Sequence, residues 1–174
     1  MTGKQLQQRF ESLLHEHRKI VFKVASVYAR QPDDRQDLAQ EISVQLWRSF
    51  GNYDEQRAKF STWMYRIALN VAISQVRRDS SRLAERIEPL QPFHLETIGG
   101  EPPPEPDERL AEMYAVIGAL DPLNRALILL YLEDRSYAEI ADVMGISETN
   151  VATKINRVKR KLRGQMTAAQ TTGA

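Results

Sequence analysis

Apolar residues recur at three- to four-residue spacing through the first 80 positions of the chain, which is the period of one helix face. A first helical segment ends at the Gln31-Pro32-Asp33-Asp34 cluster, because these residues favour turns. We expect Asp34 to cap a second helix, which ends where a loop begins at Gly51. Ser61 or Thr62 is placed to cap a third, long helix. The apolar stripes of these segments are Phe10, Leu13, Leu14, Val21, Val24, Ala25 and Tyr28; Leu38, Ile42, Leu46 and Phe50; and Met64, Ile67, Ala68 and Val71.

This pattern stops in the middle of the sequence. Between positions 83 and 108, seven acidic residues face only one basic residue, Arg86. Four prolines lie between Pro102 and Pro106, and such a run is incompatible with an α-helix. High charge and few apolar residues also disfavour a packed core. We therefore predict an extended acidic linker over residues 83–107.

A second helical unit is predicted from residue 108 to residue 164, followed by a disordered tail over 165–174. Asp121-Pro122 is a typical helix start, and Ser136-Tyr137-Ala138-Glu139 has the form of a capping box. Gly145 can adopt the left-handed conformation of a tight turn, and Ser147 can cap the last helix. The apolar stripes here are Leu110, Met113, Tyr114, Ile117 and Leu120; Leu123, Leu127, Leu130 and Tyr131; and Val151, Ile155, Val158 and Leu162. The predicted fold is all-α, with two small helical domains joined by a Pro/Glu-rich linker.

The segment from Ser136 to Leu162 indicates a helix-turn-helix. A short capped helix, a glycine turn and a second capped helix with one apolar stripe are the geometry of a DNA-reading helix. Basic residues near the end of this helix can bind DNA phosphates. Cations are also common at helix C-termini because they interact favourably with the helix dipole. Two roles of Glu148 are consistent with the sequence. Its carboxylate can stabilise the N-terminus of the helix, or it can accept a hydrogen bond from the amino group of a cytosine. The candidate DNA-contacting residues are Ser147, Glu148, Thr149, Asn150, Thr153, Lys154, Asn156, Arg157 and Arg160.

Charge and composition narrow the function further. The net charge is only +1, but it divides into +5 over residues 1–82, −6 over 83–108 and +2 over 109–174. The absence of cysteine excludes disulfides and thiolate zinc sites. The polar start lacks the apolar block of a secretion signal, and the longest apolar run, 126–132, is too short for a membrane span. We expect a cytoplasmic protein without membrane insertion.

The residues show no catalytic chemistry, and we expect neither an enzyme nor a cofactor. Asp37 and Glu41 share a helix face at a spacing that a metal could use, but no histidine joins them. A solvated or partner-facing acidic patch explains them better, so we predict no metal site. His15 and His17 are two positions apart and point in different directions on a helix.

Two stretches resemble the sigma factors of bacterial RNA polymerase. The runs Asp37-Leu38-Ala39-Gln40-Glu41-Ile42, Leu46-Trp47 and Phe60-Ser61-Thr62-Trp63-Met64-Tyr65-Arg66-Ile67-Ala68-Leu69-Asn70 are similar to the second conserved region of that family. Residues 120–162 resemble its fourth region. Because the sequence shows no third domain and no N-terminal extension, the resemblance is to the small extracytoplasmic-function group.

This resemblance implies roles for both units and names partners. Residues 1–82 would bind the coiled coil of the largest subunit of core polymerase and melt the downstream promoter element, and residues 108–164 would read the upstream element as duplex. The flap of the second-largest subunit and an anti-sigma factor would be further partners. The implied core-polymerase-binding residues are Asp37, Gln40, Glu41 and Arg48, and the implied downstream-element residues are Lys59, Thr62, Trp63, Arg66, Asn70, Arg77 and Arg78.

The third helix supports part of this assignment without the resemblance. Trp63, Arg66, Asn70, Ser74 and Arg77 fall on one stripe, and aromatic, basic and amide groups together suit single-stranded DNA. For Trp63, the sequence is consistent both with a position on this surface and with a position in the core.

Two other functions stay open from the residues. A helix-turn-helix regulator would bind duplex DNA without being a polymerase subunit, and an all-helical adaptor would bind only proteins. The sequence also departs from the family at Ala152, where a lysine is common, so the base preference there is not fixed by the resemblance.

Overall fold

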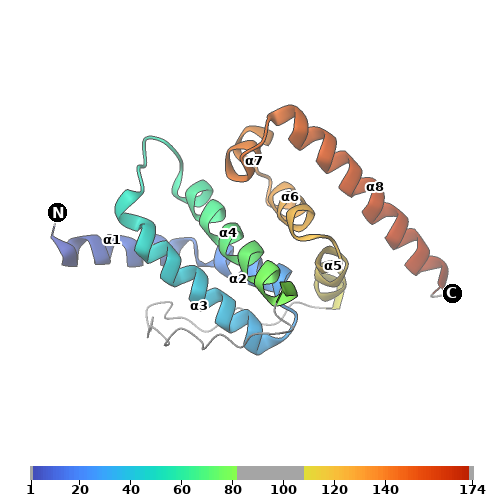
Figure 1. Cartoon of the computed structure of the whole chain (residues 1–174), viewed down its shortest axis with the longest axis horizontal. Coiled ribbons are helices and arrows are strands. Elements are labelled where there is room, and N and C mark those ends of the chain that lie inside the picture. The colour runs from blue at the N-terminus through green and yellow to red at the C-terminus, as the bar shows by residue number, and fades with distance from the viewer. Residues whose placement is uncertain (1, 82–107, 173–174) are drawn as a thin grey trace. The chain divides into compact units, whose positions relative to one another are not determined.

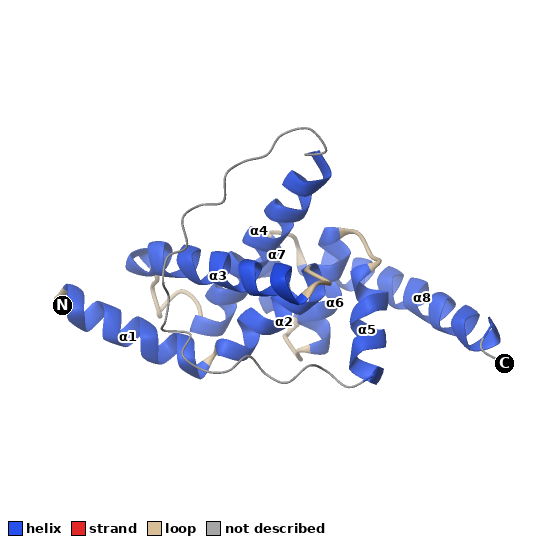
Figure 2. Ribbon diagram, turned by 90° about the horizontal axis from the view of Figure 1, so that it is seen from below, coloured by secondary structure: helices blue, strands red, loops and turns tan. Residues whose placement is uncertain are grey.

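The structure is a computed structural model that describes residues 2–81 and 108–172 of the 174-residue chain. Within these residues every regular element is a helix, which confirms the predicted all-α fold (Figure 2). The chain divides into two compact units, residues 1–104 and 105–174, and each is described by itself. The predicted linker at 83–107 lies outside the described residues.

The N-terminal unit contains four α-helices and one short 3-10 helix among its described residues. These are α1 (Gly3–Glu16), α2 (Arg18–Tyr28), α3 (Pro32–Ser49), η1 (Phe50–Asn52) and α4 (Phe60–Ser81), coloured blue to green in Figure 1. Helices α2, α3 and α4 pack against one another. Their shared core includes Val24, Ile42, Leu46, Met64 and Ala68, all without solvent exposure. The predicted stripes of α2 and α3 therefore face the core, because each helix buries the face that carries its apolar residues. On α4 the buried face also includes Tyr65 and Leu69, and the predicted Ile67 and Val71 are only half-buried.

The helix starts differ from the sequence predictions in three places. The first predicted segment forms two helices, α1 and α2, which meet at His17. Gln31 is the N-cap of α3 and Pro32 occupies its first turn, so Asp34 lies inside the helix and does not cap it. Proline suits this position because its missing N–H has no intrahelical partner there, and Asp34 still interacts favourably with the positive end of the helix dipole. Helix α4 begins at Phe60, so Ser61 and Thr62 lie in its first turn rather than at its cap.

The C-terminal unit consists of α5 (Glu108–Gly118), α6 (Pro122–Leu132), α7 (Tyr137–Met144) and α8 (Glu148–Thr172) in the described residues. Helix α8 packs against the other three. Asp121 is the N-cap of α6, with Pro122 at its start, as predicted. The core is small and is built from Ile117, Leu120, Ala126, Leu127, Leu130, Ile140, Val151, Ile155 and Val158.

Three residues predicted to lie on buried stripes are exposed. Leu110, Met113 and Leu123 keep 42%, 38% and 44% of their surface accessible. Helix α5 is buried only at its end, through Ile117 and the following Leu120. Periodicity identifies the apolar face of a helix, but a neighbour must be present to cover it.

The predicted disordered tail is also different in the structure. Helix α8 continues to Thr172, so residues 165–172 are helical. This stretch contains neither proline nor glycine, the two residues that disfavour a helix most strongly. A helix that has already formed therefore extends through it at little cost.

Two glycines of this unit give a matched test of backbone conformation. Gly145 has φ +69°, and a Cβ there would meet no atom within 4 Å, so Gly145→Ala should cost only backbone strain of about 1–2 kcal/mol. Gly164 lies inside α8 with equally open space, so Gly164→Ala should raise the free energy of unfolding by about 0.5–1 kcal/mol. Hydrogen exchange of the α6–α8 amides measures both. If the amides of the Gly145→Ala variant were as well protected from exchange as those of the Gly164→Ala variant, the left-handed conformation at Gly145 would be contradicted.

Candidate nucleic-acid interfaces

Local hydrogen bonds fix the turn between α7 and α8. The Ser136 hydroxyl oxygen accepts from the Glu139 N–H at 3.1 Å, and the Ser147 hydroxyl oxygen accepts from the Asn150 N–H at 3.2 Å. Each bond satisfies an N–H that the first turn of a helix leaves without a partner. Gly145 ends α7 in the left-handed conformation. The predicted serine caps and glycine turn are confirmed, and they set the direction in which α8 leaves the turn. Of the predicted capping box only the bond from the Glu139 N–H is present, and the Glu139 carboxylate accepts from the Ser136 hydroxyl at 3.3 Å instead of from its backbone N–H.

Helix α8 has one buried face and one exposed face. Val151, Ile155 and Val158 are 0%, 0% and 2% exposed, which confirms the predicted stripe. All nine candidate DNA-contacting residues lie on the exposed surface of the unit. The Thr153 hydroxyl donates to the Thr149 carbonyl oxygen at 3.0 Å, so its proton is engaged within the helix. This face therefore combines hydroxyl, amide and cationic groups along about three turns.

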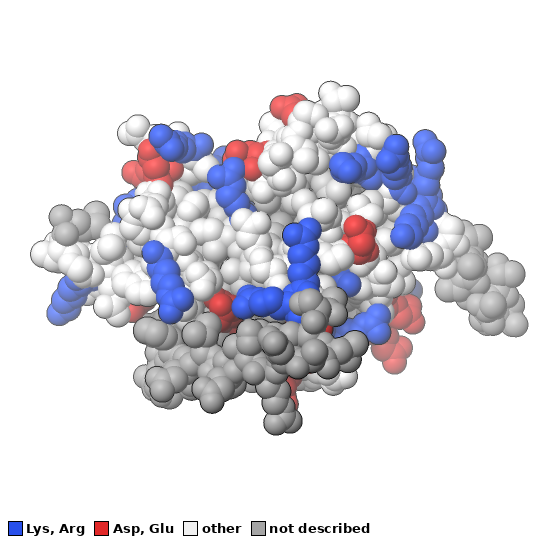
Figure 3. Space-filling model, in the orientation of Figure 1, with Lys and Arg blue, Asp and Glu red and all other residues white. Residues whose placement is uncertain are grey.

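The cations of α8 have different surroundings. Figure 3 shows Lys and Arg side chains gathered over α8, and those exposed are Lys154, Arg157, Arg160, Lys161 and Arg163. Lys159 instead places its Nζ 4.1 Å from the centre of the Tyr131 ring on α6, at cation–π distance. Lys159 thus ties α8 to its own unit, while the five exposed cations remain accessible to solvent.

The candidate residues on α4 divide into exposed and buried groups. Arg66, Asn70, Arg77 and Arg78 are exposed, as is Lys59 just before the helix. Thr62 is only 6% exposed, so its side chain belongs to the packed interior and offers little surface to DNA. Position 62 lies in the first turn of α4, and a polar residue at a helix start carries no local signal that it will be buried.

Trp63 is half-buried within a cluster of aromatic rings. Its ring centre lies 5.0 Å from that of Tyr53, 5.3 Å from Phe60 and 6.1 Å from Phe50. Phe10 contacts the same cluster from α1, with ring centres 5.1 Å from Phe50. Trp63 therefore packs in the core of the unit and also keeps part of its surface accessible. Sequence reasoning missed this cluster, although the density of aromatic residues between positions 47 and 63 signals it.

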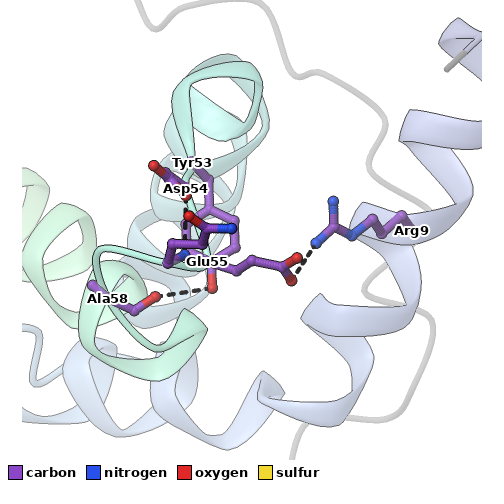
Figure 4. Close-up of polar contacts among 6 residues, drawn as sticks. Arg9, Tyr53, Asp54, Glu55 and Ala58 are labelled. Carbon is purple, nitrogen blue, oxygen red and sulfur yellow. Dashed lines mark hydrogen bonds and ion pairs between the residues drawn. The ribbon is translucent and has the colours of Figure 1, made fainter.

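The loop between η1 and α4 is held by its own polar contacts (Figure 4). The Tyr53 hydroxyl donates to the Ala58 carbonyl oxygen at 3.1 Å, and the Gln56 N–H donates to Asp54 Oδ1 at 3.0 Å. Arg9 of α1 reaches Glu55 at 2.9 Å. Burial raises the pKa of Tyr53 above its ordinary value; the Glu55 carboxylate adds to the rise, and Arg9 opposes it. Tyr53 therefore stays protonated and able to donate at neutral pH.

The four candidate residues on α3 share one face by their spacing. Asp37, Gln40 and Arg48 are exposed, and half-buried Glu41 accepts from Gln45 Nε2 at 3.4 Å. Among the described residues, no three His, Cys, Asp or Glu side chains gather closely enough to hold a metal ion. A search of the same residues finds no helix with the length and hydrophobicity needed to cross a membrane.

Comparison with known families matches both units. Residues 13–82 match Sigma-70 region 2, and residues 110–162 match Sigma-70 region 4. The class defined by this fold and these surfaces is thus the sigma factor, a protein that initiates transcription with RNA polymerase.

Curated relatives and solved structures narrow the class. The chain is 31% identical to the RNA polymerase sigma-H factor of Pseudomonas aeruginosa, covering 88% of this chain and 83% of that protein. It is 31% identical to the ECF RNA polymerase sigma factor SigE of Mycolicibacterium smegmatis over 88% of this chain, and it spans only 60% of that relative. The structure of CnrH in complex with the cytosolic domain of CnrY is similar with a TM-score of 0.66 and 26% identity, covering 93% of this chain and 90% of CnrH. The chain belongs to the extracytoplasmic-function sigma factors.

Lys159 and Lys161 provide a test of which cations on α8 are structural. Lys159→Met keeps the apolar stem but removes the charge over Tyr131, so it should lower the free energy of unfolding of this unit by about 0.5–1 kcal/mol. Lys161→Met removes an exposed charge and should leave stability unchanged within about 0.5 kcal/mol. Hydrogen exchange of the α6 and α8 amides compares the two. Equal effects would show that the ring contact contributes nothing.

Proposed function

We propose that the two units of this sigma factor handle promoter DNA in two different forms. The N-terminal unit, residues 1–82, binds core RNA polymerase and melts the downstream promoter element. The C-terminal unit, residues 108–164, reads the upstream element as duplex. The observation that carries the proposal is that the exposed candidate residues divide between two separately packed units, each matching its own sigma region.

The C-terminal unit presents α8 to the major groove. Residues at the N-terminal half of a recognition helix reach base edges, while later cations contact phosphates. Thr149, Asn150 and Asn156 supply hydroxyl and amide groups for bases, and Arg157 and Arg160 lie on the exposed side for the backbone. Glu148 is exposed in the first turn of α8, where a cytosine amino group would be a suitable donor to it.

The N-terminal unit presents α4 to single-stranded DNA. Arg66, Asn70 and Arg77 are exposed along one side of the helix, and Trp63, three residues before Arg66, is half-buried. Cations attract the phosphates of a separated strand, aromatic rings stack with unstacked bases, and amides can form hydrogen bonds with them. Lys59, at the end of the preceding loop, extends this positive surface. The strand bound here would be the non-template strand.

Core polymerase binding is assigned to α3. The exposed Asp37, Gln40 and Arg48 and the partly exposed Glu41 form a mixed polar face on the opposite side from the buried Ile42 and Leu46. An exposed face of mixed polar and charged groups suits the coiled coil of the largest polymerase subunit. The flap of the second-largest subunit is the proposed contact of the C-terminal unit.

An anti-sigma factor is a further proposed partner. The similar structure of CnrH contains the cytosolic domain of CnrY, and another structure with the same fold is a sigma factor with the anti-sigma factor NepR. Such a partner would act by covering surfaces that polymerase needs. We place the protein in the cytoplasm with its polymerase, and we assign it no catalytic chemistry of its own.

Transcription with purified components tests the proposal. The chain and core RNA polymerase are incubated with a library of promoter fragments, and the transcripts are sequenced. Specific runoff transcripts that require both components are the expected result. Duplex binding that needs no core polymerase would instead favour a regulator, and binding to neither would favour a protein adaptor.

Single substitutions should separate the two surfaces in the holoenzyme. Arg157→Ala removes a phosphate contact, so it should lower the salt dependence of duplex promoter binding by about one unit in the slope of log K against log salt. Arg66→Ala should leave that slope unchanged and weaken capture of a single-stranded oligonucleotide carrying the downstream element. Fluorescence anisotropy measures both. Loss of duplex affinity from Arg66→Ala alone would contradict the division of roles.

A further inference from the structure

A contact between α1 and the loop before α4 joins two parts of the N-terminal unit that are far apart in the sequence. Arg9 donates from a guanidinium nitrogen to Glu55 Oε2 at 2.9 Å, across 46 positions of the chain (Figure 4). Residue 9 also precedes the stretch that matches the sigma family, which begins at residue 13. One partner of the contact, Arg9, therefore lies before the matched stretch, while Glu55 lies within it.

Helix α1 is anchored where Arg9 leaves it. The neighbouring Phe10 is 2% exposed, and its ring centre lies 5.2 Å from that of Trp47 and 5.1 Å from that of Phe50. Thr2 and Gln5 form a capping box at the start of the helix. The Arg9 guanidinium carbon also lies 5.9 Å from the centre of the Phe50 ring. Arg9 is thus held between an aromatic face and a carboxylate, which limits its freedom before it reaches the loop.

The loop that Arg9 contacts leads directly into the proposed DNA surface. Glu55 lies between Tyr53, which packs against Trp63, and Ala58, whose carbonyl oxygen accepts from the Tyr53 hydroxyl. The N–H groups of Arg57 and Ala58 donate to the Asp54 carbonyl oxygen at 3.1 and 3.4 Å. A restraint on Glu55 therefore restrains a short closed turn that ends next to Lys59.

We propose that Arg9, supported by Phe10, is a positioning residue that holds the loop 53–59 ready to capture unstacked promoter bases. The inference rests on the proposed role of α4 and its preceding loop in binding single-stranded DNA. A loop already fixed in its binding conformation loses less conformational freedom on capture, so the affinity for the separated strand is higher.

The sign of the charge on Glu55 makes the proposal testable. A carboxylate beside a DNA-binding surface repels phosphates, so a Glu55 that acted only through its charge would weaken binding. On that account, Glu55→Gln would bind DNA more tightly. If Glu55 instead holds the loop through Arg9, the same substitution binds DNA more weakly. The two explanations predict changes of opposite direction.

The experiment compares four variants of the full chain in the holoenzyme. Arg9→Ala and Glu55→Gln break the pair, and the exchange Arg9→Glu with Glu55→Arg restores it in reverse. Lys4→Ala is the matched control, because it removes an exposed cation from the same helix. Anisotropy measures affinity for a single-stranded oligonucleotide carrying the downstream element of the promoter recovered from the library. Hydrogen exchange of the Arg57 and Ala58 amides reports on the loop, and core polymerase affinity reports on the fold.

Both single variants should weaken oligonucleotide binding about two- to fivefold, the range expected for a partly exposed ion pair. Exchange of the two loop amides should become faster, with core polymerase affinity unchanged. The charge exchange should recover most of both losses, and Lys4→Ala should leave loop exchange as it is. Tighter binding by Glu55→Gln, or failure of the exchanged pair to rescue, would overturn the proposal.

The result also separates this inference from the function on which it rests. If Arg66→Ala weakens oligonucleotide binding but the Arg9 and Glu55 variants do not, only the positioning role is wrong. If Arg66→Ala has no effect, α4 does not bind the single strand, and both the surface and the positioning role are overturned.

Discussion

Helices α4 and α8 each bury one face, and this packing decides which of their side chains are left to bind other molecules. On α8, burial of Val151, Ile155 and Val158 turns the opposite face outward. On α4, burial of Met64, Ala68 and Ala72 has the same effect for Arg66 and Asn70. A core built from so few residues fixes the rotation of each helix, since a turn of the helix would expose apolar surface at about 25 cal/mol per Å². The DNA-handling faces are consequences of packing inside each unit.

The cluster of aromatic rings around Phe50 fixes the segment between α3 and α4 in the same way, by packing. Phe50 contacts Phe10 of α1, and it meets Trp63 of α4 by a ring contact. Each such ring pair adds about 0.5–1.5 kcal/mol beyond the burial of its area. A loop between two helices is thereby tied to the core on both sides. The surface proposed to receive single-stranded DNA is consequently built on a fixed frame.

Local features of the sequence predicted the caps and the turn that orient α8. Contacts between residues far apart in the sequence were not predicted. The caps at Ser136 and Ser147 and the turn at Gly145 depend on residues within a few positions of one another, so their pattern is readable. The pair of Arg9 and Glu55 depends on the folded path of 46 residues, which no local pattern contains. Exposure of Leu110 was missed for a related reason, because periodicity does not reveal whether a neighbouring element exists. The family assignment itself came from the specific motif around Trp63, and the comparisons confirm it.

We have proposed that one sigma factor holds the two promoter elements on separate units, one as a single strand and the other as duplex. Photo-crosslinking from positions 70 and 156 of the holoenzyme on an open promoter complex tests this division. Position 70 should crosslink to the non-template strand within the melted region, and position 156 should crosslink to the upstream duplex. Crosslinks from both positions to the same duplex segment would contradict it.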